Sequence, residues 1–145
     1  MGAVCGLRTF TGTAITASAA NHRDLNLKDT PLAWLASDGA AATLLILATG
    51  ELIADKLPSM PDRIQPASLA ARFVSGAVCG LAIARGHKRR QQIIGAIIGG
   101  TAAVAAAYAG FEYRKRVKMP ALAKALIEDT VAVGAARAII ANVCA

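Results

Sequence analysis

The stretch Gln91–Phe111, QQIIGAIIGGTAAVAAAYAGF, contains 21 residues and no charged side chain. A helix needs about 20 mostly apolar residues to cross the hydrocarbon core of a lipid bilayer. Lipid offers the backbone no hydrogen-bond partner, so such a segment is expected to satisfy its own N–H and C=O groups as an α-helix. This stretch therefore predicts a membrane-embedded helix.

Four more apolar segments accompany this run, at residues 2–20, 32–55, 68–84 and 120–143. Each of the four also carries ionisable side chains, which are Arg8, Asp38, Glu51, Asp55, Arg72, Lys124, Glu128, Asp129 and Arg137. Polar or proline-rich stretches separate the early segments, as expected for loops. We predict an all-α integral membrane protein with four to five membrane-embedded helices in a single domain, residues 1–145.

The composition favours a lipid environment. Hydrophobic residues make up 55% of the 145 residues and charged residues 17%, whereas soluble domains are typically about 45–50% apolar and about 25% charged. The formal net charge is +7, and the basic residues stand mostly in short clusters beside the apolar segments. Such clusters fit anionic lipid head groups better than nucleic acid. We expect the bilayer as a partner and no nucleic acid; a soluble all-helical protein is the alternative.

Catalytic signatures are missing from the sequence. It contains no HExxH, GxSxG, P-loop or dinucleotide-binding glycine pattern, so neither an enzyme nor a cofactor is expected. His22 and His87 lie in polar loops without a second ligand at metal-binding spacing, and the sequence leaves a metal site open. The cysteines Cys5, Cys79 and Cys144 form no CxxC pair, and we expect free thiols packed as small hydrophobic side chains.

An internal repeat is visible at an offset of 74 residues. The sequence GAVCG occurs at Gly2–Gly6 and again at Gly76–Gly80. At the same offset, LIAD at Leu52–Asp55 corresponds to LIED at Leu126–Asp129. Transporter folds are often built from such repeats. The pattern predicts two related halves, about 1–73 and 74–145.

The segment 91–111 has two interpretations, which differ in how the basic side chains are distributed between the two sides of the membrane. If all five segments cross the membrane, six basic side chains lie on one side and seven on the other, which is no orienting bias. If this segment enters and returns, turning at Gly99-Gly100, its basic flanks share a side and the counts become ten and three. A plain span and a re-entrant hairpin both stay open as hypotheses.

The candidate functional groups are carboxylates inside apolar segments. Glu51 and Asp55 are four residues apart, and so lie on one face of a helix. Glu128 and Asp129 are the acids of the last segment. A charge at the bilayer centre costs roughly 2.5–3.5 kcal/mol, so such residues face a partner, a cavity or an ion path. We predict that the four carboxylates line a cation or proton path between the two halves.

Basic side chains near these acids are predicted to act as counter-charges. They are Arg8, Lys56, Arg72 and Arg137. The alternative is a set of structural ion pairs, in which Glu51 is neutralised by Arg8 or Arg72. Lys124 could likewise pair with Glu128, four residues later on the same helix. A buried pair of this kind holds geometry and need not perform chemistry.

Small residues recur at the spacing that lets helices approach closely in lipid. The pairs Gly76 and Gly80, and Gly95 and Gly99, have GxxxG spacing. We predict that these glycines pack helices together, and that the chain forms a homo-oligomer.

Five short stretches carry a family resemblance over nearly the whole chain. They are GLR at Gly6–Arg8, WLAS at Trp34–Ser37, ELIADKLP at Glu51–Pro58, ARFVSGAV at Ala71–Val78 and LIED at Leu126–Asp129. In this order they resemble the bacterial small membrane proteins catalogued as domain of unknown function 4126. The resemblance implies a multi-pass protein of the bacterial inner membrane, and it implies no particular activity.

Together these observations lead to two functional hypotheses. The first is a transporter or exporter of a small solute or cation that uses the intramembrane carboxylates. The second is a structural or partner-binding membrane subunit without a transport path. Polar groups lining a wet cavity favour the first, and a dry core with every acid paired favours the second.

Overall fold

The computed structural model describes residues 1–28, 30–54, 65–118 and 120–144, and these residues form helices and loops without any strand. The elements in chain order are α1 (Gly2–Leu7), α2 (Thr11–Asn21), the short 3-10 helix η1 (Ala33–Ala36), α3 (Asp38–Ala54), α4 (Pro66–Ile83), α5 (Arg89–Arg116) and α6 (Ala121–Cys144). The predicted all-helical fold is confirmed.

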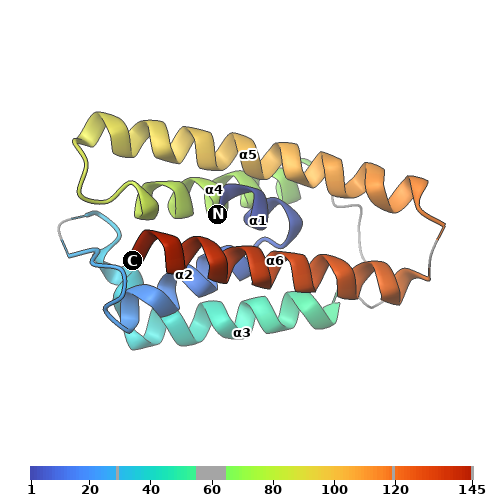
Figure 1. Cartoon of the computed structure of the whole chain (residues 1–145), viewed down its shortest axis with the longest axis horizontal. Coiled ribbons are helices and arrows are strands. Elements are labelled where there is room, and N and C mark those ends of the chain that lie inside the picture. Colours follow the sequence, from blue (N-terminus) through green and yellow to red (C-terminus); the bar gives the residue numbers. More distant parts are fainter. Residues whose placement is uncertain (29, 55–64, 119, 145) are drawn as a thin grey trace.

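Helices α3, α4, α5 and α6 run along the long axis of the molecule, and the shorter α1 and α2 lie among them (Figure 1). Helices α4 and α5 lie side by side, α1 packs against both, and α2 packs against α3 and α6. The loop after α2 and the connection between α4 and α5 lie at one end of the bundle, and the connection between α5 and α6 lies at the other (Figure 1). Only α4 and α5 are both long and apolar enough to cross a membrane, among the helices described.

Helix α5 is continuous over 28 residues, or about 42 Å at the rise of an α-helix. The re-entrant interpretation of residues 91–111 is therefore wrong. Gly99 and Gly100 are buried within the helix and do not turn the chain. A β-carbon on Gly99 would overlap the carbonyl oxygen of Gly76, so this glycine permits close packing against α4 instead.

The same close approach extends along α5. A β-carbon on Gly76 would meet the carbonyl of Gly99, and one on Gly80 would meet the carbonyl of Gly95. In α1, a β-carbon on Gly2 would also overlap the carbonyl of Gly99. Both GAVCG segments thus pack on α5 through glycine. We call this contact, formed by the glycines of α1, α4 and α5, the glycine seam.

The first apolar segment, residues 2–20, is not one helix. It consists of α1 and α2, separated by Arg8–Phe10, where Arg8 has the extended backbone angles φ −140° and ψ 113°. Six and 11 residues make helices of about 9 Å and 16 Å, too short to cross a bilayer core of about 30 Å. The hypothesis in which all five segments cross the membrane counts residues 2–20 as one span, and these two short helices do not support it.

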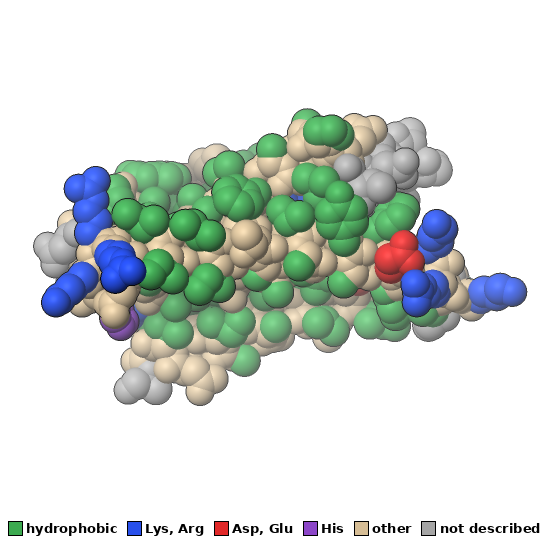
Figure 2. All heavy atoms as spheres, turned by 90° about the horizontal axis from the view of Figure 1, so that it is seen from above, with side chains coloured by type: hydrophobic (Ala, Val, Ile, Leu, Met, Phe, Trp, Pro, Cys, Tyr) green, Lys and Arg blue, Asp and Glu red, His purple; other side chains and the backbone are tan. Residues whose placement is uncertain are grey.

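Apolar side chains cover the middle of the surface. Exposed large hydrophobic residues include Leu45 and Ile46 of α3, Ile97 and Ile98 of α5, and Val131 of α6. Figure 2 shows hydrophobic side chains along the middle of one face and Lys and Arg side chains gathered at its two ends. An apolar patch of this extent marks contact with a membrane or another protein.

The glycine seam predicts unequal effects of two alanine substitutions. Gly99→Ala forces a methyl group into the backbone of α4 and should lower the free energy of unfolding by about 1–3 kcal/mol. Gly134→Ala is the matched control, because a β-carbon at this helical glycine meets nothing within 4 Å. It should be neutral or stabilising by up to about 1 kcal/mol. Denaturant unfolding in detergent measures both, and equal effects would contradict the seam.

Candidate functional site

The break between α1 and α2 is held by a carboxylate from α3. A helix that starts inside the protein leaves backbone N–H groups without partners in its first turn. Here the N–H groups of Thr9 and Phe10, the two residues just before the first turn of α2, donate to Glu51, at 2.7 Å to Oε1 and 2.9 Å to Oε2. Hydrogen bonds from N–H groups to an ionised carboxylate are among the stronger ones in proteins. Glu51 therefore pins the break to α3.

Arg8, the first residue of the break, is completely buried. Its guanidinium forms an ion pair with Asp129 of α6, whose side chain is 16% exposed. A buried guanidinium cannot lose its proton, so it requires anionic or polar partners. The sequence indicated Arg8 as a counter-charge, and the structure places it against Asp129.

Arg72 completes the arrangement from α4. It is 4% exposed, and its Nη1 donates to the carbonyl oxygen of Gly6, in the last turn of α1. Its Nε lies 3.3 Å from Ser68 Oγ on the same helix. A cation therefore meets the carbonyl end of α1 and the Glu51 carboxylate meets the N–H end of α2, as the helix dipole favours at each end.

Four charged side chains thus gather around the break from four parts of the chain. They are Arg8, Glu51, Arg72 and Asp129, which we call the charge centre. Two carry a positive charge and two a negative charge, so the set is formally neutral. Neutrality reduces the cost of keeping charges away from water, because each group has an opposite charge or an oriented dipole nearby.

Glu128 follows Asp129 in sequence but pairs elsewhere. Its two carboxylate oxygens accept hydrogen bonds from Arg114 of α5, at 2.6 Å from Nε and 2.7 Å from Nη2. Lys124, the partner proposed from helical spacing, instead donates from Nζ to the Arg114 carbonyl at 2.8 Å. The fork shape of the guanidinium matches a carboxylate better than an ammonium does. This pair fastens α6 to α5.

The remaining predicted residues do not join the charge centre. Asp55 and Lys56 lie outside the described residues. Arg137 is exposed and lines a cavity of about 660 Å³ with Ser18 and His22. It lies eight residues beyond Asp129, or about 12 Å along the helix. Of the three predicted site carboxylates that the structure describes, Glu51 and Asp129 come to the break and Glu128 does not.

No group of three or more His, Cys, Asp or Glu side chains suited to a metal ion occurs among the described residues. The described part of the chain therefore holds no candidate metal centre.

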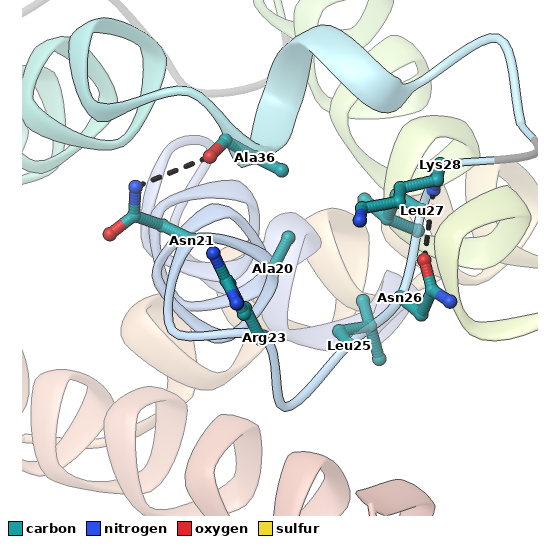
Figure 3. A pocket seen from close by; sticks show the side chains of 8 residues that line it. All are labelled: Ala20, Asn21, Arg23, Leu25, Asn26, Leu27, Lys28 and Ala36. Atoms are coloured by element: carbon teal, nitrogen blue, oxygen red, sulfur yellow. Dashed lines mark hydrogen bonds between the residues drawn. The ribbon is translucent and has the colours of Figure 1, made fainter.

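Cavities lie at the end of the bundle and on its flanks. One, of about 370 Å³, is formed by the end of α2, the following loop and η1. Figure 3 shows Asn21 and Arg23 on one side of it and Asn26 and Lys28 on the other. Asn21 Nδ2 donates to the Ala36 carbonyl at 3.2 Å, which closes the loop against η1. Another cavity, of about 310 Å³, reaches Glu128 between α1, α5 and α6.

Sequence reasoning missed the backbone donors at Thr9 and Phe10 and the partner role of Arg114. The sequence held one sign of the break that contains these donors: Arg8 and the threonines after it make segment 2–20 unusually polar. Threonine is a weak helix former that offers its hydroxyl to nearby backbone groups. Thr13 Oγ1 does so here, donating to the Phe10 carbonyl at 2.9 Å. For Arg114, no local pattern connects it with Glu128.

The buried pair of Arg8 and Asp129 should couple in a double-mutant cycle. Arg8→Met leaves the Asp129 carboxylate without this cation and should destabilise the protein by about 3–5 kcal/mol. Adding Asp129→Leu should recover at least about 1 kcal/mol relative to the sum of the single changes. The control is the exposed pair of Arg116 and Glu112, 3.2 Å apart, where loss of one partner should cost at most about 1 kcal/mol. Additive costs at Arg8 and Asp129 would argue against the pair.

The comparison of the sequence with protein families gives a match over nearly the whole chain. A family model described as domain of unknown function (DUF4126) matches residues 1–141. Comparisons with curated proteins and with solved structures found no match. The family match covers all helices of the bundle except the last residues of α6, and it confirms the resemblance seen in the sequence. The chain belongs to the DUF4126 family.

Proposed function

We propose that the chain is a multi-pass protein of the bacterial inner membrane. The apolar middle of the surface and the basic ends fit a bilayer core between two head-group layers. Besides the two apolar helices, α3 has 17 residues and α6 has 24, or about 25 Å and 36 Å. Among the residues of α3, only Ala48 is buried. A helix so exposed and so apolar requires lipid or another protein around it.

We infer further that the protein carries a small solute or cation across this membrane, with the charge centre as its site. The observation that supports this most directly is the Glu51 carboxylate on the N–H groups of Thr9 and Phe10. Interrupted helices at membrane depth occur where they are enclosed by protein or line a cavity. Transporters use such breaks to bind substrate and coupling ions near the midplane.

The carboxylates of the charge centre suggest how a proton or cation could act. Protonation of Glu51 removes the charge that holds the start of α2, so the hold of α3 on the break weakens. A proton or cation at Asp129 competes with Arg8 in the same way. Either event changes the packing of the α1–α2 hairpin against α3 or α6. The hairpin would then have two arrangements, as transport requires.

The internal repeat is part of the same proposal. Cys5 and Cys79 occupy equivalent positions in the two GAVCG segments, 74 residues apart, and their sulfur atoms are 3.5 Å apart. Contact between equivalent residues supports two related halves, about 1–73 and 74–145, whose GAVCG segments meet on α5.

A structural membrane subunit is the second candidate, and one observation favours it. The three interior carboxylates that the structure describes all have partners, in backbone N–H groups or arginines. A centre satisfied in this way can serve only to position the hairpin. The exposed apolar face of α3 would then bind a partner or a second copy of the chain, consistent with the expected homo-oligomer.

Glu51→Gln distinguishes the two functions. The amide oxygen replaces one of the two carboxylate oxygens that accept from Thr9 and Phe10, while the amide NH2 faces the other N–H group and the charge is lost. Flux is therefore read only from variant protein whose thermal unfolding shows that it is folded. If the charge centre carries protons or cations, flux in liposomes should fall at least about tenfold, since proton-transfer groups contribute effects of this order or larger. Glu112→Gln is the control, because Glu112 is exposed at the end of α5 and its loss should leave flux unchanged.

Ion flux through the wild-type protein in liposomes decides whether the transport function holds at all. If it gives no proton, sodium or potassium flux above empty liposomes, the transport function is contradicted for these ions. Full flux in a well-folded Glu51→Gln variant would remove Glu51 from the path. Loss of folding without any wild-type flux would favour the structural subunit.

The membrane topology can be tested at the two ends of α5. Because α5 is continuous, single cysteines replacing Lys88 and Lys118 should react with an impermeant maleimide from opposite faces of sealed vesicles. Cys144 is exposed and would be replaced by serine, whereas Cys5 and Cys79 are buried. The Cys144→Ser variant without an introduced cysteine retains only Cys5 and Cys79 and is the control for background labelling. Labelling of both introduced cysteines from one face would contradict the proposed span.

A further inference from the structure

Two of the three cysteines meet in the interior. Cys5 of α1 and Cys79 of α4 are both fully buried, and their Sγ atoms are 3.5 Å apart. They pack with Ala103 of α5 in one small cluster. The third, Cys144, is exposed near the C-terminal end of α6. The two buried thiols are therefore in direct contact while the third is separate from them.

The glycine seam produces this contact. Glycines on either side of the cysteines allow α1 and α4 to approach the same stretch of α5 with almost no side chains between the backbones. Gly12 leaves room for one sulfur, because a β-carbon there would overlap Cys5 Sγ. On the other side, Thr16 Oγ1 lies 3.5 Å from Cys79 Sγ. The two sulfurs are enclosed by packing that directs them at each other.

We propose that Cys5 and Cys79 form a reversible redox pair, which closes to an intramolecular disulfide under a membrane-permeable two-electron oxidant. A disulfide needs the sulfur atoms about 2.05 Å apart, so the thiols must approach by about 1.5 Å from their present contact. Helix α1 has six residues, and so short a segment adjusts more readily than the long helices.

The chemistry balances with an oxidant of the azo class. One thiol adds across the N=N bond and gives a sulfur–nitrogen adduct. The second thiol displaces nitrogen from that sulfur, which forms the S–S bond. Both S–H bonds are broken, two electrons and two protons pass to the oxidant, and the azo compound leaves as a hydrazine. A dithiol reductant reverses the change by exchange.

Closure would join α1 covalently to α4. The α1–α2 hairpin then could not shift along the seam, and the chain between the cysteines would become a closed loop spanning 74 positions. Loops of this length lose much conformational freedom in the unfolded state, so the oxidised form should be more stable. This inference stands on the sulfur contact and does not depend on the transport function.

The test uses the full chain in detergent with Cys144→Ser, so that only the pair is present. The folded protein is treated with diamide, quenched, denatured and alkylated with N-ethylmaleimide. Both thiols should escape alkylation, the intact mass should fall by two hydrogen atoms, and digestion should give a peptide linking Cys5 to Cys79. The wild-type chain is treated in parallel as a control for the oxidant. Disulfide-linked dimers formed through the exposed Cys144 show that the oxidant is active.

A second measurement distinguishes a native cross-link from oxidation after unfolding. The oxidised Cys144→Ser protein should melt at least about 5 °C above its reduced form, and the variant that also carries Cys79→Ser should show no shift. Two alkylated thiols per chain under conditions that dimerise the wild type through Cys144 would overturn the proposal. A link that forms only after denaturation would overturn it as well.

Discussion

The hydrogen bonds from Thr9 and Phe10 to the Glu51 carboxylate are the interaction on which the rest of the site depends. A chain that interrupts a helix inside an apolar bundle exposes backbone N–H groups that water does not reach, and each one left unsatisfied is costly. Glu51 satisfies two of them with one side chain. It thereby determines where α2 starts, how α3 lies beside α2, and why the first apolar segment forms a hairpin of two short helices. The buried Arg8 is a consequence, because the break brings its guanidinium inside, where Asp129 pairs with it.

The glycine seam provides the second constraint, and it acts on the opposite side of the hairpin. Six residues make a helix that has little stability of its own, so α1 depends on its contacts with α4 and α5. Glycines allow backbones to approach closely, and dispersion contacts replace the missing side chains. The Arg72 guanidinium adds a hydrogen bond to the Gly6 carbonyl in the last turn of α1. The hairpin is thus held by charge at its turn and by packing along α1, and the contact of Cys5 with Cys79 results from that packing.

The charge centre is compatible with either proposed function because the same physics supports both. Buried ion pairs compensate much of their desolvation cost only when geometry and partners are complete. A complete set gives a rigid centre, which suits a structural subunit. It also gives a centre that one proton or cation can alter: neutralising Glu51 weakens its hold on the Thr9 and Phe10 N–H groups, and neutralising Asp129 leaves the Arg8 guanidinium without that counter-charge. What separates the two functions is whether a partner is exchanged, and the Glu51 carboxylate is the group at which exchange would alter the fold most directly.

The sequence by itself determined the helical class, the apolar membrane-length segment at Gln91–Phe111, the family and the residues able to pack closely, because these depend on composition and local spacing. It indicated which charges had to be partnered, but it did not determine the partners. The turn that the re-entrant hypothesis placed at Gly99-Gly100 is absent, because both glycines lie within α5, where Gly99 packs against Gly76 and Gly100 against Phe73. Glu128 binds Arg114 and not Lys124, since α5 brings a guanidinium to it. Glu51 binds backbone N–H groups of a segment more than 40 residues away. Spacing along a chain can be read for one helix at a time, whereas contacts among α1, α3, α5 and α6 exist only once all of them have packed.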